Sequence, residues 1–233
     1  TQPAVFLHSI ITYLTKSGDE KPEAVAGHSL GEFTALVAAG ALKFEDALVL
    51  VYKRAMAMQA ACEKTEGTMA AIMIKDNAIV EEVCDACENI VVPANYNNPG
   101  QLVISGSMAG VEEASKLLTE SGAKVIPLSV GGAFHSPLMQ SAQDELQQAI
   151  EQTDFSTPFC PIYQNVNAKP FTDTTEIKAN LINQLTGSVR WQQTIENMVA
   201  NGVSGFTEVG GRGRILLGMV RKITREVKMD MLS

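Results

Sequence analysis

The sequence predicts an α/β fold in which a mostly parallel sheet has helices on both faces and an inserted subdomain interrupts the chain. Short apolar strands alternate with amphipathic helices over much of the sequence, an order typical of parallel sheets covered on both sides. A middle stretch of about 60 residues follows the order β-α-β-β-α-β instead, which is that of a ferredoxin-like unit. A Gly-x-Ser-x-Gly stretch, residues 27–31, lies where a strand is expected to turn into a helix.

The N-terminal part contains an amphipathic helix over residues 1–16, followed by a short strand over 23–27. The helix expected over 30–39 ends at Gly40, because glycine readily adopts the left-handed conformation that closes a helix. A longer helix follows over 44–64.

The inserted unit is assigned to residues 67–130, which leaves 1–66 and 131–233 for the main core. A turn of Asn97-Asn98-Pro99-Gly100 joins its two middle strands, since these residue types favour tight turns. Its expected elements, in order, are strand 68–74, helix 77–88, strand 90–97, strand 102–107, helix 109–120 and strand 123–130.

Strand–helix alternation resumes after the insertion. Ser136 is a suitable cap for the next helix, and Pro137 fits its first position because proline lacks the N–H that a helix start leaves unpaired. The expected elements are helix 137–151, strand 161–166, helices 174–185 and 191–200, strand 205–209 and a last helix from residue 214.

The composition fits one or two globular domains, with 45% hydrophobic and 19% charged residues in a chain of 233. A net charge of −8 argues against a nucleic-acid-binding surface. No apolar run reaches the ~18 residues that span a bilayer. We therefore expect neither a nucleic acid nor a membrane as partner.

The four cysteines are expected to be structural. Cys84-x-x-Cys87 lies in a predicted helix without the second pair or the histidines that a zinc site requires, so no metal is expected. Reduced thiols and the lack of an export signal indicate a cytoplasmic location.

Positive charge is concentrated near the C-terminus, where six of the 18 Lys and Arg lie between Arg212 and Lys228. They are Arg212, Arg214, Arg221, Lys222, Arg225 and Lys228. We favour a solvated terminal helix; a docking patch for an acidic partner is the alternative.

Ser29 has the surroundings of a nucleophile on a tight strand-to-helix turn, as in hydrolase-like sheets, so we expect a hydrolase-like core. Gly27 and Gly31 leave room for the backbone, and the N–H groups at the start of the next helix can bind a developing oxyanion. The alternative is that Ser29 caps the helix, with Glu32 at the spacing of a capping box.

A nucleophilic serine needs a neighbouring base, and the chain has three histidines. His8 lies within the first helix, and His28 is adjacent to Ser29, where consecutive side chains diverge. His135 lies in a loop between a strand and a helix, where α/β sheets build sites, and is therefore the expected base. No acid occupies an obvious strand-end loop, so a backbone carbonyl or an amide is a plausible partner for its other nitrogen.

Arg54 lies on the apolar stripe of helix 44–64, between Leu50 and Met58. A guanidinium stays protonated, and burying it unpaired is costly. Either it reaches the helix edge and solvent, or it binds an anion such as a carboxylate.

Together these residues resemble the malonyl-CoA:acyl carrier protein transacylase family of fatty-acid synthesis, which includes the acyltransferase domains of polyketide synthases. The resemblance covers essentially the whole chain. The matching stretches are Gly27–Glu32 with Ala38–Gly40, Arg54 within LVYKRAMAMQ, Met69–Ala71, Asn95–Asn97 with Pro99–Gln101, His135 before Ser136–Met139, and Gln184–Leu185 before Val189–Trp191.

The resemblance implies that Ser29 carries the acyl group, that His135 is the base and that Arg54 binds the malonyl carboxylate. It implies a ping-pong transfer of malonyl from malonyl-CoA to the phosphopantetheine thiol of acyl carrier protein, without a cofactor, and we expect a monomer. The alternatives are a serine thioesterase or esterase, or an inactive fragment that only binds.

The resemblance also implies supporting roles. The backbone N–H of Leu30 would donate to the oxyanion, and the carbonyl of Gln184 would orient the catalytic imidazole. Asn97 and Gln101 match a loop near the CoA site.

Two departures from the family pattern matter. The N-terminal Gly-Gln loop that supplies a second oxyanion donor is absent, so we expect the protein to begin upstream of Thr1 and this chain alone to be feeble or inactive. Gly211 stands where the family usually has proline, which leaves the path of that loop open.

Overall fold

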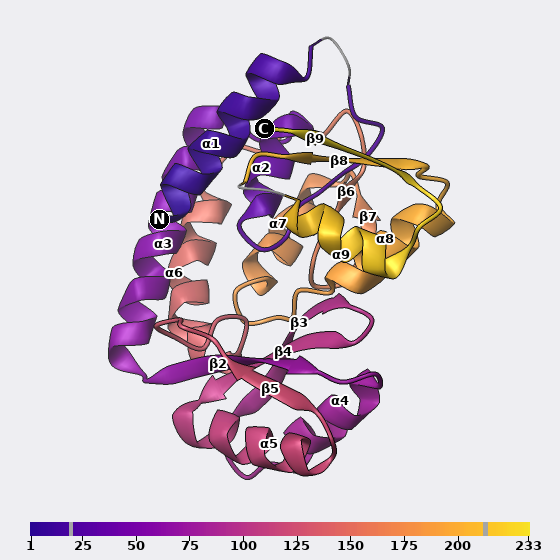
Figure 1. Cartoon of the computed structure of the whole chain (residues 1–233). Helices are drawn as coiled ribbons and strands as arrows, with labels where there is room; N and C mark the ends of the chain where they lie inside the picture. Colours follow the sequence, from indigo (N-terminus) through magenta and orange to yellow (C-terminus); the bar gives the residue numbers. More distant parts are fainter. Residues whose placement is uncertain (19–20, 212–213) are drawn as a thin grey trace.

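The computed structural model describes residues 1–18, 21–211 and 214–233, and these form an α/β fold, as the sequence predicts (Figure 1). The helices are α1 (Gln2–Lys16), α2 (Gly31–Ala38), α3 (Phe44–Lys64), α4 (Asn77–Ala86), α5 (Met108–Glu120), α6 (Gln140–Glu151), α7 (Thr174–Asn183), α8 (Trp191–Ala200) and α9 (Ile215–Ile223), with a 3-10 turn, η1, at Pro137–Met139. The strands are β1 (Val25–Ala26), β2 (Gly67–Met73), β3 (Val91–Asn98), β4 (Gln101–Ser107), β5 (Lys124–Pro127), β6 (Ile162–Tyr163), β7 (Pro170–Phe171), β8 (Gly205–Val209) and β9 (Lys228–Leu232).

The strands pair in separate groups. β1 runs parallel to β6, which pairs antiparallel with β7, and β8 runs parallel to β9. The strands of residues 67–127 form an antiparallel sheet in the order β3-β4-β2-β5, with α4 and α5 packed beside it at the lower end of Figure 1.

Short polar side chains cap the starts of α4 and α5. The carboxylate of Asp76 accepts a hydrogen bond from the N–H of Ala78 at the start of α4. Ser107 caps α5 in the same way, through the N–H of Gly110. Such caps satisfy backbone donors that the first helical turn leaves unpaired.

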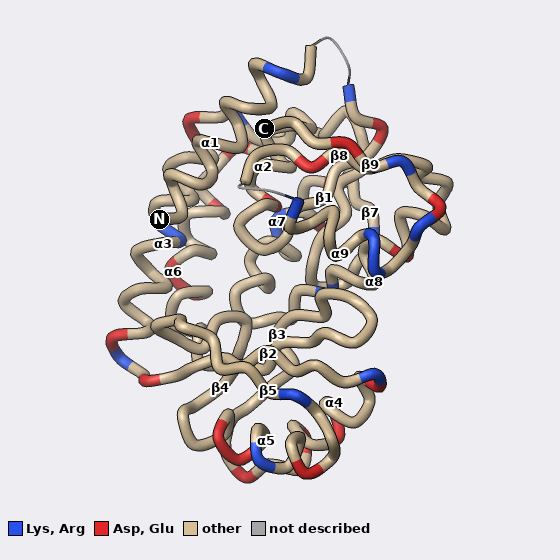
Figure 2. Tube along the Cα trace, viewed as in Figure 1, with Lys and Arg blue, Asp and Glu red and all other residues tan. Residues whose placement is uncertain are grey.

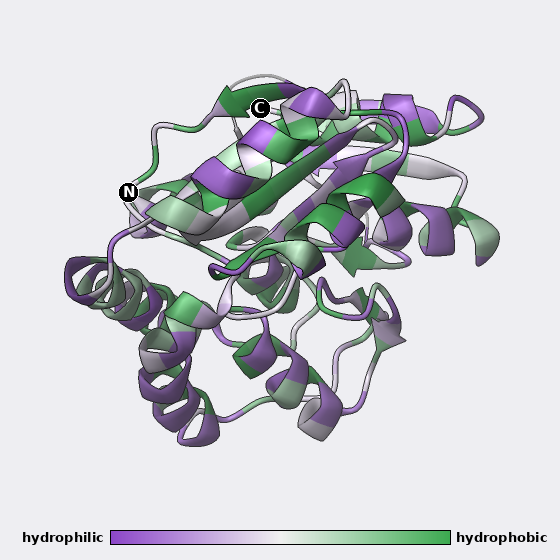
Figure 3. Cartoon of the chain, turned by 90° about the horizontal axis from the view of Figure 1, so that it is seen from below, coloured by the Kyte–Doolittle hydropathy of each residue, from purple (hydrophilic) through white to green (hydrophobic). Residues whose placement is uncertain are grey.

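The main core lies where α3 packs against α1 and α6, with α2 on the same side (Figure 1). It is filled by Phe6, Phe33, Leu36, Leu50 and Leu146, all of which are fully buried. A second cluster lies inside the four-stranded sheet and its helices, and a third joins Tyr163 and Trp191 to α9. Hydrophobic and hydrophilic residues alternate along the helices in Figure 3, as expected where one face of a helix is packed and the other is solvated.

Several details differ from the sequence-based expectation. Among the described residues the strands form three separate sheets and not one mostly parallel sheet. The strands expected over 23–27, 161–166 and 123–130 are shortened to Val25–Ala26, Ile162–Tyr163 and Lys124–Pro127. The helix expected over 137–151 begins as the 3-10 turn η1 before α6 starts. β7 was not expected, and its two residues are too short to leave a pattern. β9 was also missed, although Lys228 and Asp230 are exposed and Met229 is half-buried, an alternation typical of a strand at a surface.

In the described part of the chain, no helix has both the length and the apolarity that crossing a bilayer demands.

Candidate active site

Ser29 stands on a tight turn between β1 and α2. Its φ is 52°, a left-handed value that a residue with a Cβ rarely adopts and that is typical of functional turns. A Cβ on Gly27 would lie 1.9 Å from the carbonyl carbon of Gly31, so the turn closes only with glycine at position 27. A Cβ on Gly31 would meet no atom within 4 Å, so the expectation that both glycines give room holds for Gly27 alone.

The side chain of Ser29 does not cap α2, which begins after Leu30 and has no side-chain cap. Its Oγ lies 2.8 Å from Nε2 of His135 instead. The other nitrogen of this ring, Nδ1, lies 2.8 Å from the carbonyl oxygen of Gln184. Because a carbonyl oxygen only accepts hydrogen bonds, Nδ1 carries the hydrogen and Nε2 is free to accept the proton of the serine hydroxyl.

The environment keeps His135 neutral. The side chain is 4% exposed, and burial lowers its pKa to about 3, with the positive charge of Arg54 acting in the same direction. The carbonyl of Gln184 opposes this shift. At neutral pH the imidazole is therefore available as a base.

Arg54 is buried in α3 and does not reach the helix edge, so the solvent-exposed alternative is wrong. Its Nη2 donates to Oγ of Ser29 at 2.9 Å and to Oε1 of Gln184 at 3.3 Å, and Nη1 donates to Oε1 of Gln2 at 2.5 Å. Its buried Nε has no hydrogen-bond partner among the described residues. Burial lowers the pKa of this guanidinium to about 10, and the acid of Glu32 opposes the shift.

These groups meet at a cavity of about 260 Å³. Its walls are formed by Gln2, Ser29, Leu30, Arg54, Met58, Met69, Asn95, Phe134 and His135. Four of them were expected from the sequence: Ser29, Leu30, Arg54 and His135. The backbone N–H of Leu30 makes no hydrogen bond within the described part of the chain, so it can donate to a group bound in the cavity.

Two expected residues, Asn97 and Gln101, are absent from the walls of this cavity. Oδ1 of Asn97 lies 3.0 Å from Nε2 of His28, whose ring packs against Trp191. The side-chain oxygen of Gln101 accepts a hydrogen bond from Asn98 at the β3–β4 turn. The structure therefore brings Asn97 behind the serine turn and leaves Gln101 at the hairpin.

Sequence reasoning missed the polar groups behind Ser29. Asn165 accepts a hydrogen bond from the Ser29 N–H at 2.7 Å and donates one to the carbonyl of Gly27 at 2.7 Å. Glu32, read above as a possible capping residue, is 1% exposed and turns its carboxylate inward. A charged residue on the apolar face of α2, beside the buried Phe33, was the available signal, just as for Arg54.

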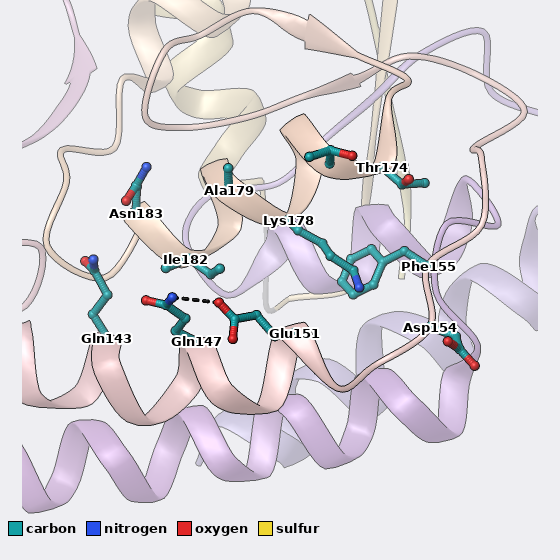
Figure 4. A pocket seen from close by; sticks show the side chains of 11 residues that line it. Gln143, Gln147, Glu151, Asp154, Phe155, Thr174, Lys178, Ala179, Ile182 and Asn183 are labelled. Carbon is teal, nitrogen blue, oxygen red and sulfur yellow. Dashed lines mark hydrogen bonds between the residues drawn. The ribbon is translucent and has the colours of Figure 1, made fainter.

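A larger hollow of about 600 Å³ lies between α6 and α7 (Figure 4). Three of its polar side chains are already paired: Gln147 donates to Glu151, and the ammonium of Lys178 donates to the carbonyl of Thr153. None of the expected site residues lines it.

The described residues contain no group of three His, Cys, Asp or Glu that could hold a metal ion. Of the C-terminal basic cluster, Arg212 lies outside the described residues. The remaining five are exposed along α9 and the start of β9, where Figure 2 shows Lys and Arg. Gly211 has a φ of 80°, which the ring of proline does not allow. Proline, the residue expected here from the family resemblance, would therefore not fit the backbone of this loop.

Comparison with known proteins places this geometry in context. Residues 1–227 match the acyl transferase domain. The malonyl CoA-acyl carrier protein transacylase of Bacillus subtilis (strain 168) is 44% identical over 237 residues, which cover 100% of this chain and 74% of that protein.

Solved structures agree with this similarity. The malonyl CoA-acyl carrier protein transacylase from Coxiella burnetii aligns with a TM-score of 0.94 at 38% identity, covering 99% of this chain and 74% of its own. A malonyl-transacylase solved in complex with a type II PKS acyl-carrier protein aligns with a TM-score of 0.93 at 36% identity, covering 99% of this chain and 76% of its own.

Proposed function

The chain belongs to the acyl transferase domain family, and on that premise we propose that it transfers a malonyl group from malonyl-CoA to the phosphopantetheine thiol of acyl carrier protein, for fatty-acid synthesis. The relatives named above are malonyl CoA-acyl carrier protein transacylases over essentially the whole of this chain. The single observation that carries the proposal is the contact of Ser29 with both a neutral base and a buried guanidinium.

The proposed first half-reaction forms a malonyl ester on Ser29. Nε2 of His135 takes the hydroxyl proton while Oγ attacks the thioester carbon, and the N–H of Leu30 donates to the resulting oxyanion. The carbon–sulfur bond then breaks, and the leaving CoA sulfur takes the proton back from Nε2.

The second half-reaction uses the same groups in reverse. The pantetheine thiol gives its proton to His135, and its sulfur attacks the ester carbon of malonyl-Ser29. The carbon–oxygen bond breaks, Oγ recovers the proton, and malonyl leaves on the carrier protein. The carbonyl of Gln184 holds Nδ1 of the imidazole throughout and stabilises the positive charge that forms on the ring. No cofactor takes part in these steps.

Selectivity for malonyl is assigned to Arg54. Its unpartnered Nε and its neutral neighbours, Gln2 and Gln184, leave the positive charge without a carboxylate in hydrogen-bond contact among the described residues. A malonyl carboxylate can supply this partner, whereas an acetyl group leaves a buried charge unpaired, which is costly.

We infer that the fold comprises a hydrolase-like core, residues 1–66 and 131–233, with a ferredoxin-like subdomain at 67–130. The order β3-β4-β2-β5 with antiparallel pairing and two helices supports the subdomain. The parallel β1–β6 pair beside Ser29 supports the core. Asn97 and Gln101, on β3 and β4, are assigned to the mouth of the CoA site at the boundary of the two units.

Acyl carrier protein is the proposed partner, and we expect the enzyme to act as a cytoplasmic monomer. The exposed basic cluster of α9 and β9 is a candidate docking surface, since an acidic enzyme needs local positive charge to attract an acidic partner. α9 packs against β3, which brings this surface close to the strand that carries Asn97.

One partition experiment separates transfer from hydrolysis. The full-length protein is incubated with malonyl-CoA and with carrier protein bearing phosphopantetheine, and malonyl-carrier protein and free malonate are measured together. We expect the thioester to exceed malonate by at least tenfold. Malonate as the main product would favour the thioesterase alternative, and no turnover would favour a protein that only binds.

A further inference from the structure

A carboxylate lies under the serine turn, at the residue that the sequence offered only as part of a capping box. Glu32 occupies the first turn of α2, three residues after Ser29, and is almost fully buried. Its Oε1 accepts a hydrogen bond from the backbone N–H of Asn165 at 2.6 Å, and its Oε2 accepts one from the side-chain amide of Gln184. It has no direct hydrogen bond with the imidazole of His135 among the described residues.

We propose that Glu32 is a positioning residue for the transfer reaction, because its carboxylate fixes the direction of the Gln184 side-chain amide and thereby the placement of Arg54 and Ser29. This role rests on the function proposed above.

The direction of the Gln184 amide follows from the chemistry of its neighbours. A side-chain amide has a donor end, Nε2, and an acceptor end, Oε1, whereas a carboxylate only accepts and a guanidinium only donates. Glu32 turns Nε2 toward itself, which leaves Oε1 facing Nη2 of Arg54. Without the carboxylate only the Ser29 carbonyl still accepts from Nε2, and a reversed amide would turn its NH₂ group toward the guanidinium, donor against donor.

The same carboxylate supports the strained turn from both sides. Nε2 of Gln184 also donates to the carbonyl of Ser29 at 3.0 Å. The backbone N–H of Asn165 donates to Glu32, and the side-chain Oδ1 of Asn165 accepts a hydrogen bond from the N–H of Ser29. Both backbone polar groups of a residue with a φ of 52° are thus fixed by partners that Glu32 holds.

The placement of Glu32 also keeps Arg54 available to substrate. Gln184 stands between the two charges, so the acid offsets the buried positive charge without forming a direct ion pair with it. Both carboxyl oxygens of Glu32 accept hydrogen bonds from N–H groups, which is the contact pattern of the ionised form. Burial raises its pKa, and the donors Asn165 and Gln184 and the charge of Arg54 oppose that shift. A carboxylate in direct contact with the guanidinium would compete with malonyl for it.

Three variants test this role in the full-length protein: Glu32→Gln, Gln184→Glu and the two combined. The matched control is Glu45→Gln, which alters an exposed glutamate in the first turn of α3 and reproduces any effect on the helix dipole. Steady-state kcat and KM are measured with malonyl-CoA and acetyl-CoA, and thermal unfolding gives the folded fraction at the assay temperature.

For Glu32→Gln we expect kcat/KM with malonyl-CoA to fall at least tenfold, and the malonyl-over-acetyl preference to narrow by a similar factor. The combined variant restores a match of donor and acceptor between positions 32 and 184, but sets an anion against Arg54. Its kcat with acetyl-CoA should therefore recover toward that of the parent while the KM for malonyl-CoA stays raised. Gln184→Glu alone places two carboxylates together, and it should lose transfer from both malonyl-CoA and acetyl-CoA.

The role is overturned if Glu32→Gln matches the Glu45→Gln control within twofold in kcat, KM and preference. It is also overturned if malonyl and acetyl transfer fall together, in proportion to the unfolded fraction, because that result describes a merely structural residue. If the parent protein transfers no malonyl, the proposed function itself is overturned. This result is seen in the parent assay, before any variant is compared, so it is distinct from a failure of the role of Glu32.

Discussion

Arg54 donates a hydrogen bond to the hydroxyl of Ser29, with 2.9 Å between Nη2 and Oγ. The group assigned to the substrate carboxylate therefore touches the group assigned to the attack. In malonyl a single methylene group separates the carboxylate from the thioester carbon, so binding the carboxylate at the guanidinium places the thioester carbon beside Oγ. Selection and chemistry are coupled through this contact.

Arg54→Ala should remove the preference for malonyl. Truncation leaves the carboxylate without its partner in a buried cavity, and we expect kcat/KM with malonyl-CoA to fall about 10²-fold or more relative to acetyl-CoA. The control is Lys53→Ala, which removes an exposed cation from the adjacent position of the same helix. An undiminished malonyl preference in Arg54→Ala would refute the assignment.

His135→Asn should slow acylation while leaving the protein folded. Asparagine suits the backbone, because His135 has a φ of 59° and asparagine tolerates the left-handed region better than most residues. Loss of a general base typically costs about 10²–10⁴-fold in rate, which single-turnover acylation by malonyl-CoA measures. A rate within threefold of the parent, at equal thermal stability, would remove His135 from the mechanism.

The acylation rate should be nearly flat between about pH 7 and pH 5. An ordinary histidine, with a pKa near 6.5, gains a proton as the pH falls through that value, and its activity as a base drops about tenfold per unit below it. Burial and the charge of Arg54 lower the pKa of His135 to about 3, so the neutral form persists over this window. Rapid-quench measurements test this; a tenfold loss per unit with a midpoint near 6.5 would contradict the burial argument.

Two alanine substitutions in the same turn should have opposite effects on stability. Gly27→Ala places a Cβ against the backbone of Gly31 and should lower the free energy of unfolding by about 1–3 kcal/mol or more, the usual cost of overpacking. Gly31→Ala meets open space at the first position of α2 and should be neutral or stabilising, by up to about 1 kcal/mol. Thermal unfolding of the two variants, side by side, checks the pair; equal melting temperatures would show that the turn tolerates a Cβ at both positions.

Periodicity was enough for the long elements and for the coarse fold. α3 and α8 have the predicted bounds, and apolar residues recur along both at helical spacing. β7 was missed because two residues make no pattern, and its pairing with β6 depends on tertiary contacts. β9 was missed because its positive charge was assigned to the preceding helix.

The site residues also divide into those with a local sequence signal and those that depend on tertiary contacts. Ser29, His135 and Arg54 carry local signals, namely a motif, elimination among three histidines and a charge on an apolar stripe. Asn165 and the inward-facing Glu32 act through contacts across 133 positions of sequence, which no local pattern encodes. Gln184 was expected only from the family resemblance, and the several contacts of its side chain were not foreseen.

The central claim is that Ser29 carries the malonyl group, and intact-mass spectrometry after a short exposure to malonyl-CoA tests it most directly. The account predicts a mass increase of one malonyl, mapped to Ser29, absent in Ser29→Ala and discharged faster by the carrier-protein thiol than by water. An adduct that persists in Ser29→Ala, or turnover without any adduct in the parent protein, would contradict it.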